Sequence, residues 1–351
     1  MPHYNHVHLE AFGHAIPDHV VTSADIEREL APVYDRFGLH EGRLELMTGI
    51  QERRFWDPGT PPSHAAVIAG KRALENANLT GPDIDCLIYA AVSRDFLEPA
   101  TASVVHHHLA LPHKSMMFDI SNACLGFINA MQIMANMIEL RQIKSGLVVA
   151  SESGRQLVRT TIDRLLQSKT LTRQEFKTAF ASLTIGSGAI ALVMTHDSVS
   201  KTNHRLLGGV MRTATESNHL CRGSEDTGFA AESEMFMSTD SETLLQHGCA
   251  LAKETWSDFA RTMEWSADDV DRVFCHQVGI AHRDALYDAV GFDTRKDFST
   301  FDRFGNVGSV SLPLTMALGL DNDPPTCPTK IAMLGIGSGL SCAMLGVHWQ
   351  P

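Results

Sequence analysis

The sequence predicts an α/β protein in which helices cover both faces of a sheet. Short apolar runs rich in β-branched residues alternate along the chain with stretches of helical periodicity. The predicted strands are Cys86–Val92, Gly146–Ala150, Ala189–Met194, Arg272–Phe274 and Ile331–Gly335. The predicted helices between them are His64–Asn78, Gly126–Leu140, Thr243–Met263 and His282–Val290. Continuously apolar strands are typical of sheets that are buried on both faces.

Length and composition indicate a globular protein with a large core. The chain has 351 residues, of which 44% are hydrophobic and 20% are charged, and its net charge is -12. This charge argues against a nucleic-acid-binding surface and against electrostatic binding to anionic lipid. A local group of basic residues at the entrance of a site for an anionic ligand is still compatible with it. We find no apolar run near the roughly 18 residues of a membrane span and no secretory signal. Seven scattered cysteines do not resemble a disulfide framework, so we expect a reduced, cytoplasmic protein.

A change in residue composition at residues 196–206 divides the chain into two parts of similar α/β character. We predict an N-terminal half over residues 1–198 and a C-terminal half over residues 199–351. Residues 155–177 are charged, have helical spacing and lie between two predicted strands. This segment is therefore interpreted as an insertion in the first half.

Cys124 lies between an apolar strand and a helix, in the sequence Phe-Asp-Ile-Ser-Asn-Ala-Cys-Leu-Gly-Phe. A thiol at a strand-to-helix turn faces the free N–H groups and the positive end of the helix. That environment is expected to lower the pKa of the thiol and to supply a nucleophilic thiolate. The alternative is a small buried apolar residue without chemistry.

Two further polar residues and a glycine-rich segment follow later in the chain. His276 ends a short strand, Asn306 lies on a glycine-flanked turn before a helix, and Leu334–Leu340 contains three glycines. Alone, His276 could be a histidine satisfied by local hydrogen bonds, and Asn306 could be a turn residue. With Cys124 they form a coherent set, because imidazole, amide and backbone N–H groups together stabilise an oxyanion beside a thioester. The set predicts acyl transfer.

The motifs around Cys124, His276 and Asn306 resemble the Cys–His–Asn triad of the thiolase superfamily, and most closely its ketoacyl-ACP synthase III branch. The order, the spacing and the C-terminal Gly-Ile-Gly-Ser-Gly-Leu-Ser-Cys all match, and the resemblance runs from about Leu9 to Trp349. It implies a thiolase fold of two similar halves in αβαβα layers and a homodimer. It also implies that Cys124 is the nucleophile, that His276 and Asn306 polarise a thioester oxygen, and that the backbone N–H groups of Cys124 and Ser338 form a second oxyanion hole.

Glu98 lies 26 residues before Cys124, in the sequence Ser-Arg-Asp-Phe-Leu-Glu-Pro-Ala-Thr. Synthase III enzymes usually lack an acid here, whereas the OleA enzymes that begin long-chain olefin biosynthesis carry a glutamate that enters the active site of the neighbouring subunit. The resemblance therefore implies that Glu98 is a base acting across a homodimer interface. The alternative is a solvated loop carboxylate. A base is needed when two unactivated acyl thioesters are joined, because an α-proton must be removed.

Two positions depart from the synthase III pattern. The motif His-Gln-Ala-Asn is His276-Gln-Val-Gly here, and the Arg that often precedes Thr-Gly is Met47. The usual contact with the coenzyme A adenine is therefore not expected, and no substrate-binding residue is assigned.

We expect neither a metal nor a cofactor besides the coenzyme A thioesters that serve as substrates. Residues 186–191 match a dinucleotide pattern but run into a strand instead of opening a helix. The three adjacent residues His106–His108 point in different directions on a helix, which favours a solvated surface over a metal site.

The predicted reaction is a non-decarboxylative Claisen condensation of two fatty acyl-CoA molecules to a 2-alkyl-3-ketoacyl-CoA through an acyl-Cys124 thioester. The nearest rival is a decarboxylative condensation with a malonyl thioester, and the acyl donors could be acyl-ACP. Other rivals are a Cys-dependent acyltransferase or thioesterase that forms no C–C bond, and a non-catalytic acyl-binding protein.

Overall fold

The computed structural model describes residues 3–224 and 236–351 and has the predicted α/β class. In this part of the chain a nine-stranded mixed sheet has the strand order β11-β12-β13-β8-β1-β7-β6-β4-β5. The strands are β1 (Val7–Ala15), β2 (His19–Thr22), β3 (Glu52–Phe55), β4 (Cys86–Tyr89), β5 (Met116–Asp119), β6 (Ser145–Glu152), β7 (Gly188–His196), β8 (Arg205–Thr213), β9 (Cys221–Arg222), β10 (Ser238–Thr239), β11 (Arg272–Cys275), β12 (Thr329–Gly337) and β13 (Ser341–Trp349).

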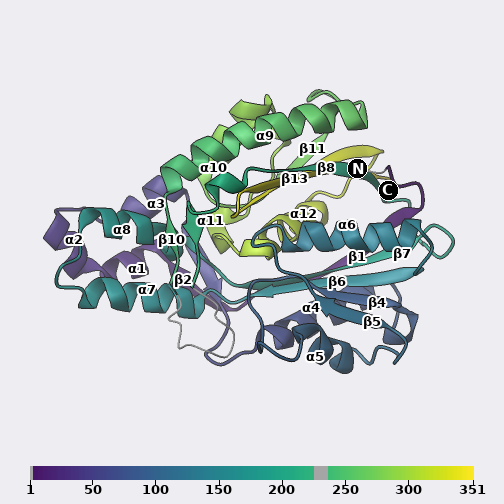
Figure 1. The fold of residues 1–351 in the computed structure, drawn as a ribbon, viewed down its shortest axis with the longest axis horizontal. Helices are drawn as coiled ribbons and strands as arrows, with labels where there is room; N and C mark the ends of the chain where they lie inside the picture. The colour runs from purple at the N-terminus through teal and green to yellow at the C-terminus, as the bar shows by residue number, and fades with distance from the viewer. Residues whose placement is uncertain (1–2, 225–235) are drawn as a thin grey trace.

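Helices lie on the outer faces of the sheet and between its two parts, as Figure 1 shows. They are α1 (Ser23–Glu29), α2 (Ala31–Phe37), α3 (Arg43–Thr48), α4 (Pro62–Asn76), α5 (Thr101–His108), α6 (Gly126–Glu139), α7 (Arg155–Gln167), α8 (Arg173–Ala179), α9 (Ser241–Met263), α10 (Ile280–Val290), α11 (Phe301–Phe304) and α12 (Ser311–Asn322). Within residues 3–224 and 236–351, no helix combines the length and the apolar character needed to cross a bilayer.

The strand order repeats along the chain. In the first run, β1 pairs antiparallel with β7, β7 pairs antiparallel with β6, and β6 pairs parallel with β4. In the second run, β8, β13, β12 and β11 follow the same sequence of antiparallel, antiparallel and parallel pairings. The runs meet at a single pair, His8 with Arg205. The boundary predicted after residue 198 falls in the connection between β7 and β8.

Helices α6 and α12 fill the space between the two runs of strands. A Cβ added to Gly146 of β6 would meet Met134 of α6, and one added to Gly335 of β12 would meet Ile128 of the same helix. Helix α6 therefore packs against both runs, and most of its apolar residues are buried in the main core. The resulting layers, helix, sheet, helix, sheet and helix, can be followed in Figure 1.

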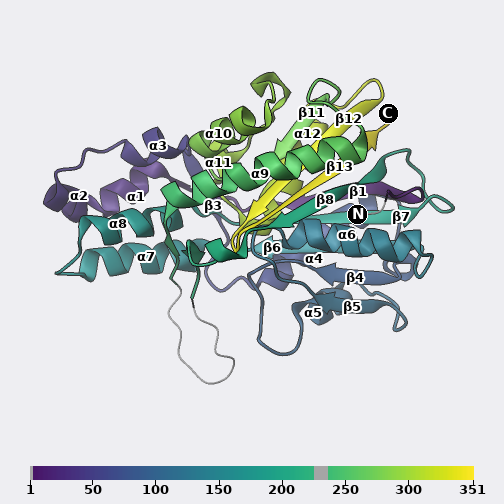
Figure 2. The ribbon, with the colours of Figure 1, turned by 45° about the horizontal axis from the view of Figure 1, so that its top comes forward.

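The segment predicted as an insertion is helical and lies beside the first helices of the chain. Helices α7 and α8 connect β6 to β7. Their apolar residues Val158, Ile162 and Phe176 share a separate core cluster with Ile26 and Leu30. Figure 2 shows α1, α2, α7 and α8 together at one end of the molecule, away from most of the sheet. They form a helical lobe that borders the cavity described next.

Candidate active site

A cavity of about 1590 Å³ brings together four of the five predicted site residues. Cys124, His276, Asn306 and Ser338 all line it. Glu98 does not: its side chain is exposed, although the preceding residue Leu97 lines the cavity. The lining is predominantly apolar, and four basic side chains also border the cavity, namely Arg94, Arg155, Arg159 and Lys177.

Cys124 occupies a tight turn between β5 and α6. The carbonyl of Asn122 accepts a hydrogen bond from the N–H of Leu125 at 2.9 Å, and Ala123 has a left-handed backbone with φ of 46°. A left-handed non-glycine residue costs about 1–3 kcal/mol and is retained when the surrounding structure enforces it. The turn places Cys124 two residues before the first residue of α6, Gly126, as the sequence predicted.

Burial, with smaller contributions from the nearby Cys221 thiol and the Glu152 carboxylate, raises the pKa of the Cys124 thiol to about 12. The expectation that the helix start lowers this pKa is therefore wrong. Cys124 is half-buried in the wall of the cavity, and its sequence position at the helix does not reveal how strongly the surrounding side chains desolvate the thiol. Cys124 is a protonated thiol at neutral pH, and the proton must leave when a substrate is bound.

His276 follows the last residue of β11 and is almost fully buried. Its backbone N–H donates to the carbonyl of Leu334 at 2.9 Å, which continues the pairing with β12. Burial lowers the pKa of the imidazole to about 4, and neighbouring His282 contributes to the shift. The ring is therefore neutral at pH 7 and carries one N–H donor. Its Nδ1 atom is buried and has no hydrogen-bond partner among the described residues.

Gln277 ties the histidine segment to the asparagine segment. Its side-chain oxygen accepts hydrogen bonds from the N–H groups of Thr300 at 2.9 Å and Phe301 at 3.2 Å. Its side-chain nitrogen donates to the carbonyl of Cys275 at 2.9 Å. Thr300 directly precedes α11 and Phe301 begins it, and Asn306 follows two residues after the end of this helix. Sequence patterns gave no indication of this bridge, because its partners are 23 and 24 positions away.

Asn306 is held by its backbone and by its side-chain oxygen. Its N–H donates to the carbonyl of Thr184 and its carbonyl accepts from Gly186 N–H, both at 2.9 Å. The side-chain oxygen accepts from the N–H of Gly308 at 2.9 Å. With the oxygen engaged, the side-chain NH₂ group is the one available to donate a hydrogen bond into the cavity.

The glycine-rich segment approaches the nucleophile closely. A Cβ added to Gly337 would lie 3.5 Å from the backbone nitrogen of Cys124 and 3.4 Å from that of Leu125. A larger residue at this position would therefore press on the turn that carries the thiol. Ser338 follows directly, so its backbone N–H belongs to the loop that faces Cys124.

Glu152, at the end of β6, is a buried cavity residue that the sequence analysis did not identify. Its carboxylate accepts hydrogen bonds from the N–H of Val92 and the N–H of Ser93, both at 3.0 Å, and from the Ser93 hydroxyl at 2.8 Å. It also accepts from the hydroxyl of Ser309 at 2.9 Å. The carboxylate thus connects the segment that leads to Glu98 with the turn that follows Asn306.

Comparison with known proteins identifies the family of this chain. The 3-oxoacyl-[acyl-carrier-protein (ACP)] synthase III family matches residues 118–214, and its C-terminal domain matches residues 260–349. The acyl-CoA:acyl-CoA alkyltransferase of Shewanella oneidensis is 39% identical, and the alignment covers 99% of both chains. The enzyme of the same name from Xanthomonas campestris is 37% identical, again over 99% of both chains.

Solved structures of Xanthomonas campestris OleA superpose on this chain. A cerulenin-bound form has a TM-score of 0.93 at 37% identity, over 99% of this chain and 98% of that one. A variant with bound lauric acid and lauroyl-CoA has a TM-score of 0.92 at 37% identity, over 99% and 100% of the two chains. The thiolase fold is thereby confirmed. The chain belongs to the acyl-CoA:acyl-CoA alkyltransferase (OleA) family, within the 3-oxoacyl-ACP synthase III group.

Proposed function

We propose that this protein joins two fatty acyl-CoA molecules by a non-decarboxylative Claisen condensation that yields a 2-alkyl-3-ketoacyl-CoA. The observation that carries the proposal is that Cys124, His276 and Asn306 all line one large, predominantly apolar cavity. Apolar lining suits alkyl chains, and the three side chains supply a nucleophile and hydrogen-bond donors for a thioester oxygen. The lauroyl-CoA bound to a variant of Xanthomonas campestris OleA supports the same substrate class.

In the first step, the Cys124 sulfur attacks the carbonyl carbon of the first acyl-CoA. The C–S bond to coenzyme A breaks, and free coenzyme A leaves with the thiol proton. The backbone N–H groups of Cys124 and Ser338 stabilise the oxyanion during this exchange. The close approach of Gly337 to the Cys124 turn supports their pairing.

In the second step, a carboxylate removes the α-proton of a second acyl-CoA. The neutral imidazole of His276 and the amide of Asn306 donate hydrogen bonds to its thioester oxygen and stabilise the enolate. The carbanion attacks the acyl-Cys124 carbonyl, a C–C bond forms, and the Cys124 thiolate leaves and is protonated again. The lowered pKa of His276 supports its role as a neutral donor.

Glu98 of a second copy of the chain is the proposed base, and this requires a homodimer. Glu98 is exposed and does not line the cavity of its own chain. The side chains of Val92, Phe96 and Leu97 just before it are 58%, 53% and 45% exposed. Exposed apolar side chains beside an acid are expected where another subunit covers them.

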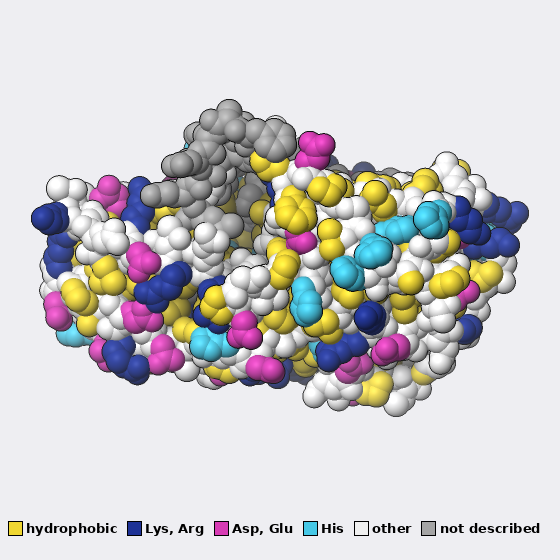
Figure 3. All heavy atoms as spheres, turned by 90° about the horizontal axis from the view of Figure 1, so that it is seen from below, with side chains coloured by type: hydrophobic (Ala, Val, Ile, Leu, Met, Phe, Trp, Pro, Cys, Tyr) yellow, Lys and Arg dark blue, Asp and Glu magenta, His cyan; other side chains and the backbone are white. Residues whose placement is uncertain are grey.

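The edge of the sheet supports the same dimer. The outermost strand β5 exposes its apolar residues Met116 and Met117 by 45% and 41%, and its outer edge has no paired strand in the described part of the chain. An exposed apolar edge is a template for pairing with another chain. Figure 3, which views the side of the molecule that carries α4, α5 and β5, shows hydrophobic side chains among interspersed charges of both signs.

The coenzyme A portion is proposed to lie where Arg155, Arg159 and Lys177 border the cavity, with its phosphates replacing the carboxylates of Glu29 and Glu242 that pair with Arg159 and Lys177 in the structure. No further cofactor enters the proposal, and the scattered positions of the seven cysteines support the proposed cytoplasmic location. Met47 also lines this cavity, at the position where an arginine is usual in synthase III enzymes. This substitution supports a coenzyme A contact that differs from theirs.

The reaction is tested by mass spectrometry of the products from a single acyl-CoA, with and without a malonyl donor. We expect the 2-alkyl-3-ketoacyl product from acyl-CoA alone. A product that appears only with the malonyl donor, accompanied by carbon dioxide, would instead establish the decarboxylative rival.

The Cys124→Ala variant should not take up radiolabel from acyl-CoA. Labelling of this variant at the wild-type level would refute the assignment of Cys124 as the nucleophile.

The base is tested with Glu98→Gln, which should retain acylation of Cys124 and lose condensation. Glu75→Gln, on the exposed surface of α4, is the matched control and should retain both activities.

Co-expression of Cys124→Ala and Glu98→Gln subunits distinguishes action across the interface from action within one chain. Mixed dimers hold one complete site only if Glu98 acts in the partner, so about a quarter of wild-type activity should return. No recovery would exclude action across the interface.

A further inference from the structure

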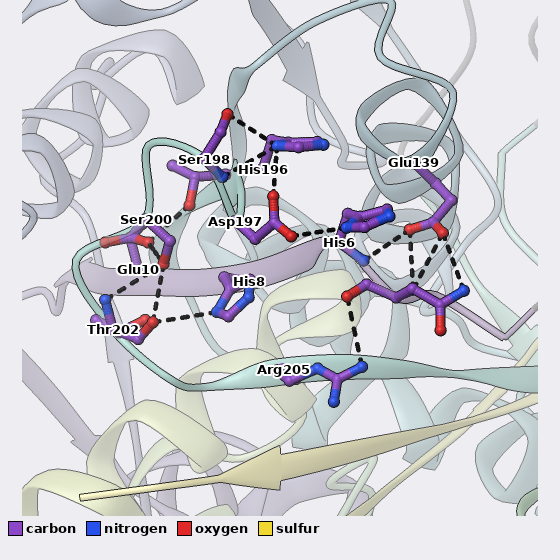
Figure 4. A network of polar contacts seen from close by, with 12 residues as sticks. His6, His8, Glu10, Glu139, His196, Asp197, Ser198, Ser200, Thr202 and Arg205 are labelled. Carbon is purple, nitrogen blue, oxygen red and sulfur yellow. Dashed lines mark hydrogen bonds and ion pairs between the residues drawn. The ribbon is translucent and has the colours of Figure 1, made fainter.

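Two histidines and an aspartate lie together at the end of the sheet opposite to the candidate active site (Figure 4). His6 directly precedes β1, and His196 ends β7 next to Asp197. The first residue of β7, Gly188, pairs with Glu152 of the cavity. At about 3.3 Å per residue, β7 separates the cluster from the cavity by roughly 26 Å. The cluster is therefore distinct from the site of condensation.

Both imidazole rings direct their Nδ1 atoms at the same carboxylate. Nδ1 of His6 is 2.7 Å from Oδ2 of Asp197, and Nδ1 of His196 is 2.8 Å from Oδ1. The two rings stack with centroids 5.2 Å apart and planes inclined by 19°. One potential ligand atom from each of the three residues lies within 4.8 Å of the other two.

Nδ1 of His196 lies beside three polar groups. The backbone N–H of Ser198 donates to it at 3.1 Å, the Ser198 hydroxyl lies 2.9 Å away, and Oδ1 of Asp197 lies 2.8 Å away. An acceptor nitrogen and a carboxylate oxygen at this distance are a pair that a shared cation would bridge. A neutral imidazole nitrogen beside a carboxylate is the form in which both groups bind a metal ion.

We propose that His6, His196 and Asp197 bind a divalent transition-metal ion, with Zn²⁺ as the ion that matches them best. Two imidazole nitrogens and one carboxylate oxygen, completed by water, form a four-coordinate set that Zn²⁺ favours. The side chains of His6 and Asp197 are 37% and 43% exposed, so an ion reaches the site from solvent. The bound ion replaces the direct contacts between the imidazoles and the carboxylate.

The ion ties the start of the first strand to the connection between β7 and β8. His6 and Asp197 are 191 positions apart, so the unfolded chain does not present this set of ligands. Binding therefore stabilises the folded protein. Glu139 at the end of α6 already accepts hydrogen bonds from the backbone N–H groups of Asn5 and His6, which positions His6 for the ion.

The test uses the full chain stripped of metal with EDTA and titrated with zinc sulfate by calorimetry. We expect one Zn²⁺ ion per chain and a rise in the melting temperature. X-ray absorption should show two imidazole ligands with Zn–N distances of about 2.0 Å. The absence of stoichiometric binding, or a spectrum without imidazole ligands, would overturn the proposal.

Two single variants and one control separate this cluster from other surface histidines. Asp197→Asn and His6→Ala should each lose the zinc-dependent rise in melting temperature while keeping condensation activity. The control replaces His106, His107 and His108 on α5 by alanine and should retain the zinc response. A response that persists in Asp197→Asn, or disappears in the control, would place the binding site elsewhere.

Discussion

The carboxylate of Glu152 accepts a hydrogen bond from the hydroxyl of Ser309 at 2.9 Å, across 157 positions of the chain. The same carboxylate holds the N–H and hydroxyl of Ser93. One buried side chain thus fixes both the segment that leads to Glu98 and the turn that follows Asn306. Two groups proposed to act on the second acyl-CoA therefore depend on a residue at the end of β6.

Replacing Glu152 by glutamine should impair condensation by about 10- to 100-fold, because its NH₂ group would face N–H donors and let both segments shift. Acylation of Cys124 should be affected less. The matched control is Glu10→Gln, another buried carboxylate that accepts several hydrogen bonds. Each variant should lose about 1–3 kcal/mol of stability, and only Glu152→Gln should lose activity. Equal activity in the two variants, measured by product formation and coenzyme A release, would remove the positioning role.

The depressed pKa of His276 predicts a pH dependence of stability. The folded value is about 4, because of burial, whereas a free imidazole has about 6.5. Between these values the unfolded chain binds a proton that the folded chain does not, so stability falls as pH decreases from 6.5 toward 4. The His276→Asn variant lacks this group, so its free energy of unfolding should fall less over this pH range. The difference from the wild type should be about 3 kcal/mol at most. Urea denaturation at several pH values measures the slope.

Exposed His107 on α5 supplies the control for this measurement. The His107→Asn variant should show the wild-type slope of unfolding free energy against pH. If His276→Asn and the wild type gave identical slopes between pH 4 and 6.5, the imidazole of His276 would not be buried in its neutral form.

The raised pKa of Cys124 predicts slow alkylation that accelerates steadily with pH. With a pKa near 12, caused first by burial, the thiolate fraction grows about tenfold per pH unit through the accessible range. The rate of iodoacetamide modification of the Cys124 peptide, followed by mass spectrometry, should therefore rise from pH 7 to 10 without a plateau. A plateau below pH 9 would show that the thiol is activated in the free enzyme.

The sequence predicted the elements that carry the strongest local patterns. The run Gly146–Ala150 lies within β6, all of whose residues are buried, and Gly126–Leu140 corresponds to α6 with one residue fewer. The positions of Cys124 and His276 could be predicted for the same reason. Each of the two residues follows a strand whose apolar run ends abruptly. Its position at the end of the sheet can therefore be inferred from the neighbouring sequence alone.

Features that depend on distant pairing could not be predicted. Strand β1 lies between β7 and β8 in the sheet, and its residues His8 and Glu10 are buried. Because these two residues are polar, the sequence of β1 lacks the continuous apolar run that predicts a buried strand. The hydrogen bonds of Glu152 come from segments 60 and 157 positions away, and no local pattern marks them. The direction of the Cys124 pKa shift was also missed, because burial is set by the whole cavity wall and not by the helix that begins beside the thiol.

The close approach of Gly337 to the nucleophile predicts the effect of one added methyl group. In Gly337→Ala the new Cβ would lie 3.2 Å from Cγ of Leu125, so this side chain must give way by a few tenths of an ångström, whereas the Cys124 nitrogen at 3.5 Å would be in ordinary contact. Because Leu125 directly follows Cys124, its adjustment is expected to move the Cys124 N–H relative to that of Ser338 and so to weaken the proposed oxyanion hole. Acylation, measured as the first burst of coenzyme A release, should slow by about 10- to 100-fold. Gly223→Ala is the control, since Gly223 lines the same cavity but a Cβ added there would meet no atom of the described residues within 4 Å. An unchanged burst in Gly337→Ala would show that the glycine-rich loop does not contribute to the first step.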